Sequence, residues 1–472
     1  MPEPRLPNLL WMVTDQQGAH MMGCAGNPHV HTPNIDFLAS RGVRFTNAWC
    51  SNPVCLPSRY SLFTGLYPST LGIASNSCLG YTRIPDGLPG DGPGHWLRRA
   101  GYDAAYGGKE HLPGMDAAAL GFEYIEKDER EALAERCVRY IGGRRPGDKP
   151  FALVASFINP HDICMMAIND FAEEGGAEQD QRLRMMNSVE TQNLAEALRL
   201  PEGMHEDIFF DQACPHAPAN LEPAADEPGA HRAVLAGRPF RRLARERYTE
   251  RQWRLHRWAY ARLTERMDAQ VGRVLGALLD SGQWDNTVVV FTSDHGDMMG
   301  NHGLWGKNTA LYDDVLRVPL VVRKPGQQHR RDVDARVSSL DVFPTLLALA
   351  GCEIPAGIDG LPLSETEARG GRDTLLSSCE GRVAVIKGDM KLCVNATGFE
   401  YRPENPLFRE LYDLGKDPLE FDNVYDAPAY RKKRDELEAI LRGEPNLLRT
   451  IFYKRGDTPY WFDAGDGPGY AQ

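Results

Sequence analysis

The feature that most constrains the fold is a series of short, uninterrupted apolar segments, each followed directly by polar residues. Residues 9–14, 151–157 and 287–292 are such segments, and helical patterns lie between them. Apolar runs of this length are typical of strands that are buried on both faces of a parallel sheet. Strands that alternate with helices predict an α/β fold in which helices sandwich a mainly parallel central sheet. Ligands bind to such sheets at the carboxyl ends of the strands.

The polar residues at these strand ends include acids, basic residues and histidines. They are Asp15 and Gln16 after the first strand, Lys109 and His111 after a short strand at 104–107, His161 after 151–157, and Asp294 and His295 after 287–292. Taken singly, each has an ordinary explanation, such as a solvated acid, a surface lysine or a buried histidine. Taken together, they come from separate segments and all lie where a site is expected.

Residues 52–65 predict a loop that enters a short helix. Pro57 suits the first helical position, and Gly65 can provide a left-handed C-terminal cap. Cys55 would then precede the helix N-terminus, where free N–H groups and the helix dipole favour an anion. Arg59, one turn later, can direct its guanidinium at the same point. The local pattern leaves two interpretations open: an inert buried cysteine, or a nucleophile beside a fixed cation.

This segment resembles the signature of the type I sulfatases of the alkaline phosphatase superfamily. The matching residues are Cys55, Pro57, Ser58, Arg59, Thr64 and Gly65, and the family's Gly-Lys-x-His and Pro-His motifs match Lys109, His111 and His161. The resemblance covers most of residues 6–425, apart from an insertion at 163–249. It implies a sulfate-ester hydrolase in which Cys55 is oxidised by a formylglycine-generating enzyme to formylglycine, whose hydrated aldehyde is the nucleophile.

The resemblance also implies a divalent metal ion. Its ligands would be Asp15, Gln16, Asp294, His295 and the converted Cys55. Many members of the family have a second acid where this chain has Gln16, which would supply a neutral oxygen instead. Hard oxygen ligands suit calcium, which is the expected ion, or magnesium, and the single imidazole leaves manganese or another transition metal open.

The remaining residues are assigned roles by the same resemblance. Arg59 and the metal would polarise the nucleophile, and Lys109 and Lys307 would hold the sulfuryl oxygens. His161, alone or with Lys307, would protonate the departing alcohol. His111 would then take a proton from the second hydroxyl and regenerate the aldehyde. The substrate, a sulfated carbohydrate or a small sulfate ester, is left open by the sequence.

Three other functions are weighed against this one. A phosphonate monoester or phosphodiester hydrolase of the same superfamily would use the same nucleophile, but Lys109 and His111 favour a sulfatase. A thiol phosphatase would need Cys-x5-Arg, whereas Arg59 is only four residues after Cys55. A catalytically inactive protein that binds a sulfated ligand would have lost a catalytic residue, and every expected residue is present.

The composition limits which kinds of partner and which cellular compartment we expect for this protein. The net charge of −12 gives no support to nucleic-acid binding, although a locally basic cleft could still attract anions. The ten cysteines have no repeated spacing, which argues against a zinc site and is consistent with free thiols. We find neither a signal-peptide core nor an apolar run of membrane-spanning length. These features predict a cytoplasmic protein without membrane contact, although a periplasmic or secreted chain trimmed of its signal peptide would share them.

The domain organisation is predicted from breaks in the pattern. Residues 1–370 would form the catalytic domain, with the weakly patterned insertion 163–249 as a lid or binding loop. Residues 371–472 would form a smaller α+β subdomain with an antiparallel sheet and an extended, aromatic-rich tail at 447–472. The tail has two interpretations: it packs along its own subdomain, or it reaches a neighbouring protomer in a symmetric dimer or tetramer.

Overall fold

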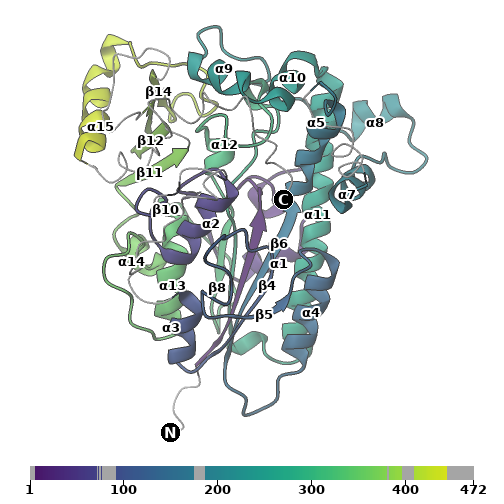
Figure 1. Ribbon diagram of the computed structural model, residues 1–472, viewed down its shortest axis with the longest axis vertical. Helices are drawn as coiled ribbons and strands as arrows, with labels where there is room; N and C mark the ends of the chain where they lie inside the picture. The colour runs from purple at the N-terminus through teal and green to yellow at the C-terminus, as the bar shows by residue number, and fades with distance from the viewer. Residues whose placement is uncertain are drawn as a thin grey trace.

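A computed structural model describes residues 6–71, 73, 76, 92–174, 187–379, 382–395 and 409–443. Its centre is an eight-stranded sheet in the order β5-β4-β6-β1-β7-β8-β2-β9 (Figure 1). The strands are β1 (Asn8–Asp15), β2 (Val43–Phe45), β4 (Asp103–Gly108), β5 (Glu123–Glu126), β6 (Phe151–Pro160), β7 (Thr287–Ser293), β8 (Leu320–Arg323) and β9 (Arg331–Val333). Only β8 runs opposite to its neighbours in this sheet, so the predicted mainly parallel α/β fold is confirmed.

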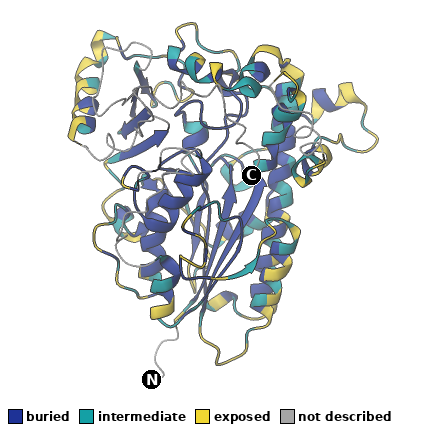
Figure 2. Ribbon diagram, viewed as in Figure 1, coloured by how far each residue is buried: buried dark blue, intermediate teal, exposed yellow. Residues whose placement is uncertain are grey.

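Helices cover both faces of the sheet, as Figure 1 shows. Alternate residues of β1 belong to two different cores: Trp11 and Val13 to one, Leu10 and Met12 to the other. The first core is closed by α2 (Cys55–Thr64), α3 (Pro93–Arg99) and α13 (Val342–Leu349), and the second by α1 (Pro33–Ser40), α4 (Glu131–Gly142) and α11 (Glu250–Asp280). The central strands β4, β6, β1, β7 and β8 are buried, and exposed residues lie on the outer sides of the helices (Figure 2). Burial on both faces explains why the strands have continuous apolar sequences.

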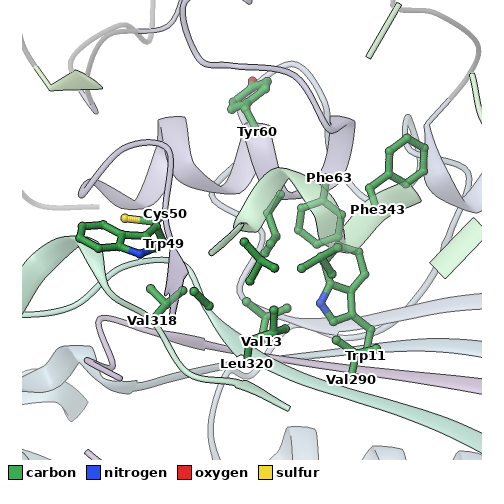
Figure 3. Close-up of a cluster of buried hydrophobic side chains, with 14 of the residues drawn as sticks. Trp11, Val13, Trp49, Cys50, Tyr60, Phe63, Val290, Val318, Leu320 and Phe343 are labelled. Atoms are coloured by element: carbon green, nitrogen blue, oxygen red, sulfur yellow. The ribbon is translucent and has the colours of Figure 1, made fainter. Parts of the chain in front are cut away.

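Helix α2 is fixed to the sheet by aromatic packing. The Phe63 ring lies on the Trp11 ring of β1, with ring centroids 4.5 Å apart, and Phe343 of α13 lies beside this pair (Figure 3). Both rings are almost completely buried, so they anchor the helix over β1 through a large apolar area. This contact determines where the N-terminus of α2 lies relative to the end of β1.

The predicted start of α2 is wrong by two residues. The helix begins at Cys55, not at Pro57, because Val54 is the extended N-cap and its carbonyl accepts the Ser58 N–H at 3.0 Å. Proline is tolerated in the first turn, where the N–H groups have no partner within the helix. The predicted cap is confirmed, since Gly65 has a φ of 68° and its N–H donates to Ser61.

A second sheet lies near the C-terminus. It is antiparallel, in the order β11 (Thr374–Cys379), β12 (Arg382–Lys387), β13 (Met390–Asn395) and β14 (Arg409–Asp413). Three of these strands are predicted by the sequence, and β11 is not. Helix α15 (Arg431–Gly443) packs on one face of the sheet, while Ile386 and Tyr412 join the main core. The tail at 447–472 lies outside the described residues.

The insertion is more regular than its sequence indicates. It forms the short helices α5 (Met165–Asp170), α7 (Val189–Ala197), α8 (Glu206–Gln212), α9 (Gly229–Ala236) and α10 (Pro239–Arg247). Several of them share a separate apolar cluster with Tyr260 and Leu263 of α11. Helices of two turns present too few apolar positions for a clear 3.6-residue period, which is why the pattern was missed. The lid role of this segment stays a prediction.

Two chemical features of the chain accompany this fold. All nine cysteines in the described residues are free thiols. Among the helices of the described ranges, none combines the length and the apolar composition that crossing a bilayer requires.

Gly108, at the end of β4, allows a close approach that positions Lys109. Its φ is +87°, a Cβ there would lie 2.0 Å from the Ser156 carbonyl oxygen, and the next N–H donates to that same oxygen. Gly101 has a similar φ of +94° but no atom near its Cβ position.

We expect Gly101→Ala to cost about 1–2 kcal/mol of unfolding free energy for backbone conformation alone. Gly108→Ala should cost a further 1–3 kcal/mol, roughly, for the clash. Urea denaturation measures both, and equal losses would contradict this account.

Candidate active site

The expected site residues meet at one edge of the central sheet. Strands β4, β6, β1 and β7 are adjacent and parallel, so their carboxyl ends lie side by side. Asp15 ends β1, His161 follows β6, and Asp294 follows β7. The N-terminus of α2 brings Cys55 to the same edge, where its sulfur is 3.4 Å from an Asp15 carboxylate oxygen. The topology therefore assembles the site from segments that are far apart in the sequence.

Four side chains form a compact cluster around Cys55. Ligand atoms of Asp15, Cys55, Asp294 and His295 all lie within 4.8 Å of one another, and all four residues are buried. The Cys55 sulfur is 3.2 Å from His295 Nε2. Burial and the neighbouring Asp15 raise the pKa of Asp294 to about 6. Carboxylates held this close to each other fit a divalent cation, which would offset their mutual repulsion. The cluster is a candidate metal site.

The guanidinium of Arg59 joins the two carboxylates. Its Nε is 2.9 Å from Asp294 Oδ2, and one terminal nitrogen is 3.1 Å from Asp15 Oδ2. The other terminal nitrogen donates to Ser156 Oγ at 2.8 Å and to the Lys109 carbonyl at 3.0 Å. Although burial opposes it, these acids raise the pKa of Arg59. Arg59 thus lies near Cys55, as predicted, but its N–H groups donate to the two acids, to Ser156 and to the Lys109 carbonyl.

Two lysines lie next to Cys55. Lys307 Nζ is 2.7 Å from the Cys55 sulfur, and Lys109 Nζ is 2.8 Å from Asp15 Oδ2. Burial and Asp15 would raise the pKa of the Cys55 thiol, but Lys307, Lys109 and His295 hold it well below its ordinary value. Likewise, burial would raise the pKa of Asp15, yet the surrounding cations keep it well below its usual range. The site stabilises negative charge at position 55.

Two further imidazoles flank the thiol. Burial is the main reason that the pKa values of His111 and His161 are both below normal, and nearby lysines add to the effect. A side-chain hydrogen bond with Cys55 acts in the opposite direction on each ring. Both histidines are therefore placed to exchange protons with groups bound at position 55.

Comparison with known proteins decides the family. The sulfatase family model matches residues 7–352. The chain belongs to the sulfatase family. It is 30% identical to the uncharacterized sulfatase YidJ of Escherichia coli (strain K12), over 97% of this chain and 93% of that one. It is 28% identical to the Delta 4,5-hexuronate-2-O-sulfatase of Bacteroides thetaiotaomicron, over 92% and 88% of the two chains.

The structure leads to the same family. It matches a solved 2-O GAG sulfatase with a TM-score of 0.75 and 27% identity, covering 94% of this chain and 93% of the other. The sulfatase is thus a sulfuric ester hydrolase, and its Cys55 lies in a buried acidic cluster that is consistent with an active site. The structure brings together the ten residues that sequence analysis expects in the site: Asp15, Gln16, Cys55, Arg59, Lys109, His111, His161, Asp294, His295 and Lys307.

Sequence analysis missed three residues that support the sulfatase site. Ser156 binds Arg59, and the Tyr260 hydroxyl donates to the Gln16 carbonyl. Asp297 accepts the side-chain amide of Gln16 at 2.6 Å. Ser156 and Tyr260 lie inside a strand and a helix without any local signal. Asp297, two residues after His295, could have been noticed as a third polar residue beyond β7.

The ion pairs of Arg59 predict a strong effect on stability. Its side chain and those of Asp15 and Asp294 are all 0% exposed, so removing the cation leaves Asp294 without its arginine partner and Asp15 with its lysine partners alone. Arg59→Met should cost about 3–5 kcal/mol of unfolding free energy. The control, Arg44→Met, breaks a pair with Asp332 whose side chains are 15% and 38% exposed, and should cost less than about 1 kcal/mol. Chemical denaturation in a chelator tests this; similar losses in the two variants would be inconsistent with it.

Proposed function

We propose that the sulfatase removes a sulfate ester from a sulfated sugar, with residue 55, converted to formylglycine, as the nucleophile. One observation carries the proposal: two ammonium groups and three imidazoles lie around position 55, at the N-terminus of a buried helix. The Lys307 ammonium is 2.7 Å from the Cys55 sulfur. The Lys109 ammonium binds one oxygen of Asp15, whose other oxygen is 3.4 Å from the same sulfur. The sulfur atom marks the place that a hydroxyl of hydrated formylglycine would occupy, and that hydroxyl would supply the attacking oxygen.

The metal site would support this chemistry. Asp15, Gln16, Asp294 and His295 would hold a divalent cation, which would supply Lewis-acid charge next to residue 55. Oxygen donors predominate in this set, so calcium is the ion we propose, and one imidazole also suits manganese. Arg59 would keep both carboxylates ionised and oriented toward the cation.

The lysines would bind the sulfate group. Both lysines are nearly buried, with 7% of the Lys109 residue and 6% of the Lys307 residue exposed, so their charges act where water screens them little. They are fixed by Asp15 and Gln16 and need no reorganisation as charge develops on the sulfuryl oxygens. His161 would donate a proton to the departing sugar oxygen, and His111 would accept one from residue 55.

The substrate class rests on the relatives. A hexuronate 2-O-sulfatase and a 2-O GAG sulfatase are similar to this chain over most of its length. We therefore propose a sulfated uronic-acid sugar as the first substrate to test. The converted enzyme should hydrolyse sulfate esters from a panel of sulfated sugars with a higher kcat/KM than it shows on an aryl phosphonate. A preference for the phosphonate would refute the proposed function.

The proton-donor role of His161 predicts a dependence on the leaving group. An alkoxide needs a proton as it departs, whereas nitrophenolate does not. His161→Ala should therefore lower kcat on an alkyl or sugar sulfate by roughly 10²- to 10⁴-fold and affect nitrophenyl sulfate much less.

The matched control is His205→Ala, since the His205 side chain is 73% exposed in the insertion. This variant should match the unaltered enzyme on both substrates. Equal losses on the two substrates in His161→Ala would exclude His161 as the acid.

A further inference from the structure

We infer that Asp297 is a positioning residue, which orients the side-chain amide of Gln16 so that its oxygen faces the metal site. The inference rests on the metal-dependent function proposed above and concerns a residue outside the proposed ligand set. It addresses a chemical problem that this chain has because glutamine stands at position 16. A carboxylate presents oxygen from either side, but an amide presents oxygen from one side only.

The contacts of Gln16 assign the two ends of its amide. Its Nε2 donates to Asp297 Oδ2 at 2.6 Å, and its Oε1 accepts from Lys307 Nζ at 2.7 Å. The Cys164 thiol also donates to Oε1, at 3.2 Å. A carboxylate can only accept and an ammonium can only donate, so this orientation satisfies both partners and the reverse satisfies neither.

The backbone of Gln16 is already fixed. Its φ of 68° lies in the left-handed region, which residues other than glycine adopt at a cost. Its N–H donates to Asp294 Oδ1 at 3.0 Å, and its carbonyl accepts the Tyr260 hydroxyl. The terminal torsion of a glutamine is broad and has no steric preference for one end. The rotation of the amide is therefore set by its polar partners, and Asp297 is the partner that holds the Nε2 end away from Lys307.

Asp297 itself is costly to bury. It is 0% exposed, and its remaining oxygen accepts the Met299 N–H at 2.7 Å. No ion pair with it occurs within the described ranges. Burial lowers the pKa of the neighbouring His20 and His256 to about 4, so both rings are neutral at neutral pH. A buried carboxylate without a cation lowers stability unless hydrogen bonds compensate it, which favours a functional reason for its presence.

Asp297→Asn should invert the Gln16 amide. The oxygen of the new amide at position 297 would still accept the Met299 N–H, so its NH2 group would face Gln16. The Gln16 oxygen would then have to turn toward that NH2 group, and the Gln16 NH2 would face Lys307 and the metal site. We expect Ca²⁺ and Mn²⁺ to bind about 10- to 100-fold more weakly, as measured by calorimetry on the converted, metal-stripped enzyme. The control, Asp314→Asn, removes an acid that binds Asn301 instead of Gln16, and should leave both affinities unchanged.

A second variant separates orientation from structural damage. When Gln16→Glu is combined with Asp297→Asn, the carboxylate at position 16 has two equivalent oxygens. One of them can accept from the new amide at position 297 while the other faces the metal site. This double variant should regain most of the affinity lost in Asp297→Asn. Unchanged affinity in Asp297→Asn, or failure of the double variant to recover, would overturn the inference. An unaltered enzyme that binds neither cation would overturn the metal-dependent function as well.

Discussion

The buried guanidinium of Arg59 is the interaction on which the active site depends. From one residue of α2 it bonds to Asp15 at the end of β1, Asp294 after β7, Ser156 of β6 and the Lys109 carbonyl after β4. The planar fork of an arginine can make several such bonds at fixed angles, which a lysine cannot. The helix that carries Cys55 is thereby held to four adjacent strands, β1, β7, β6 and β4, and the packing of Phe63 on Trp11 adds an apolar contact with β1.

This arrangement explains how an acidic chain can act on an anion. The net charge is −12, yet Arg59, Lys109 and Lys307 converge on one buried point. Two carboxylates offset two of these three positive charges, and a divalent cation would add further positive charge that favours binding a sulfate group. Low-dielectric walls concentrate such a local field, so the site can attract anions against the overall charge. The proposed orientation of Gln16 would matter for the same reason, since it would add a metal ligand without adding negative charge.

The strand ends and the Cys55 motif could be predicted because their signals are local. Continuous apolar runs identify β1, β6 and β7, and the residues that follow them form the site. Contacts between residues that are far apart in the sequence leave no such local signal and could not be predicted in this way. Ser156 binds Arg59 from 97 residues away, and Tyr260 reaches Gln16 from the middle of α11. The short helices of 163–249 have too few turns for a period, and the start of α2 depends on the conformation of Val54.

We propose above all that hydrolysis depends on formylglycine at position 55. The most direct test prepares the enzyme with and without a formylglycine-generating enzyme and mixes the two forms in known ratios. Mass spectrometry of the peptide containing residue 55 gives the converted fraction, and kcat is measured on a sulfate ester for each mixture. We expect kcat to rise in proportion to the converted fraction and to extrapolate to zero for the thiol form. Full activity in a preparation that contains only Cys55 would contradict it.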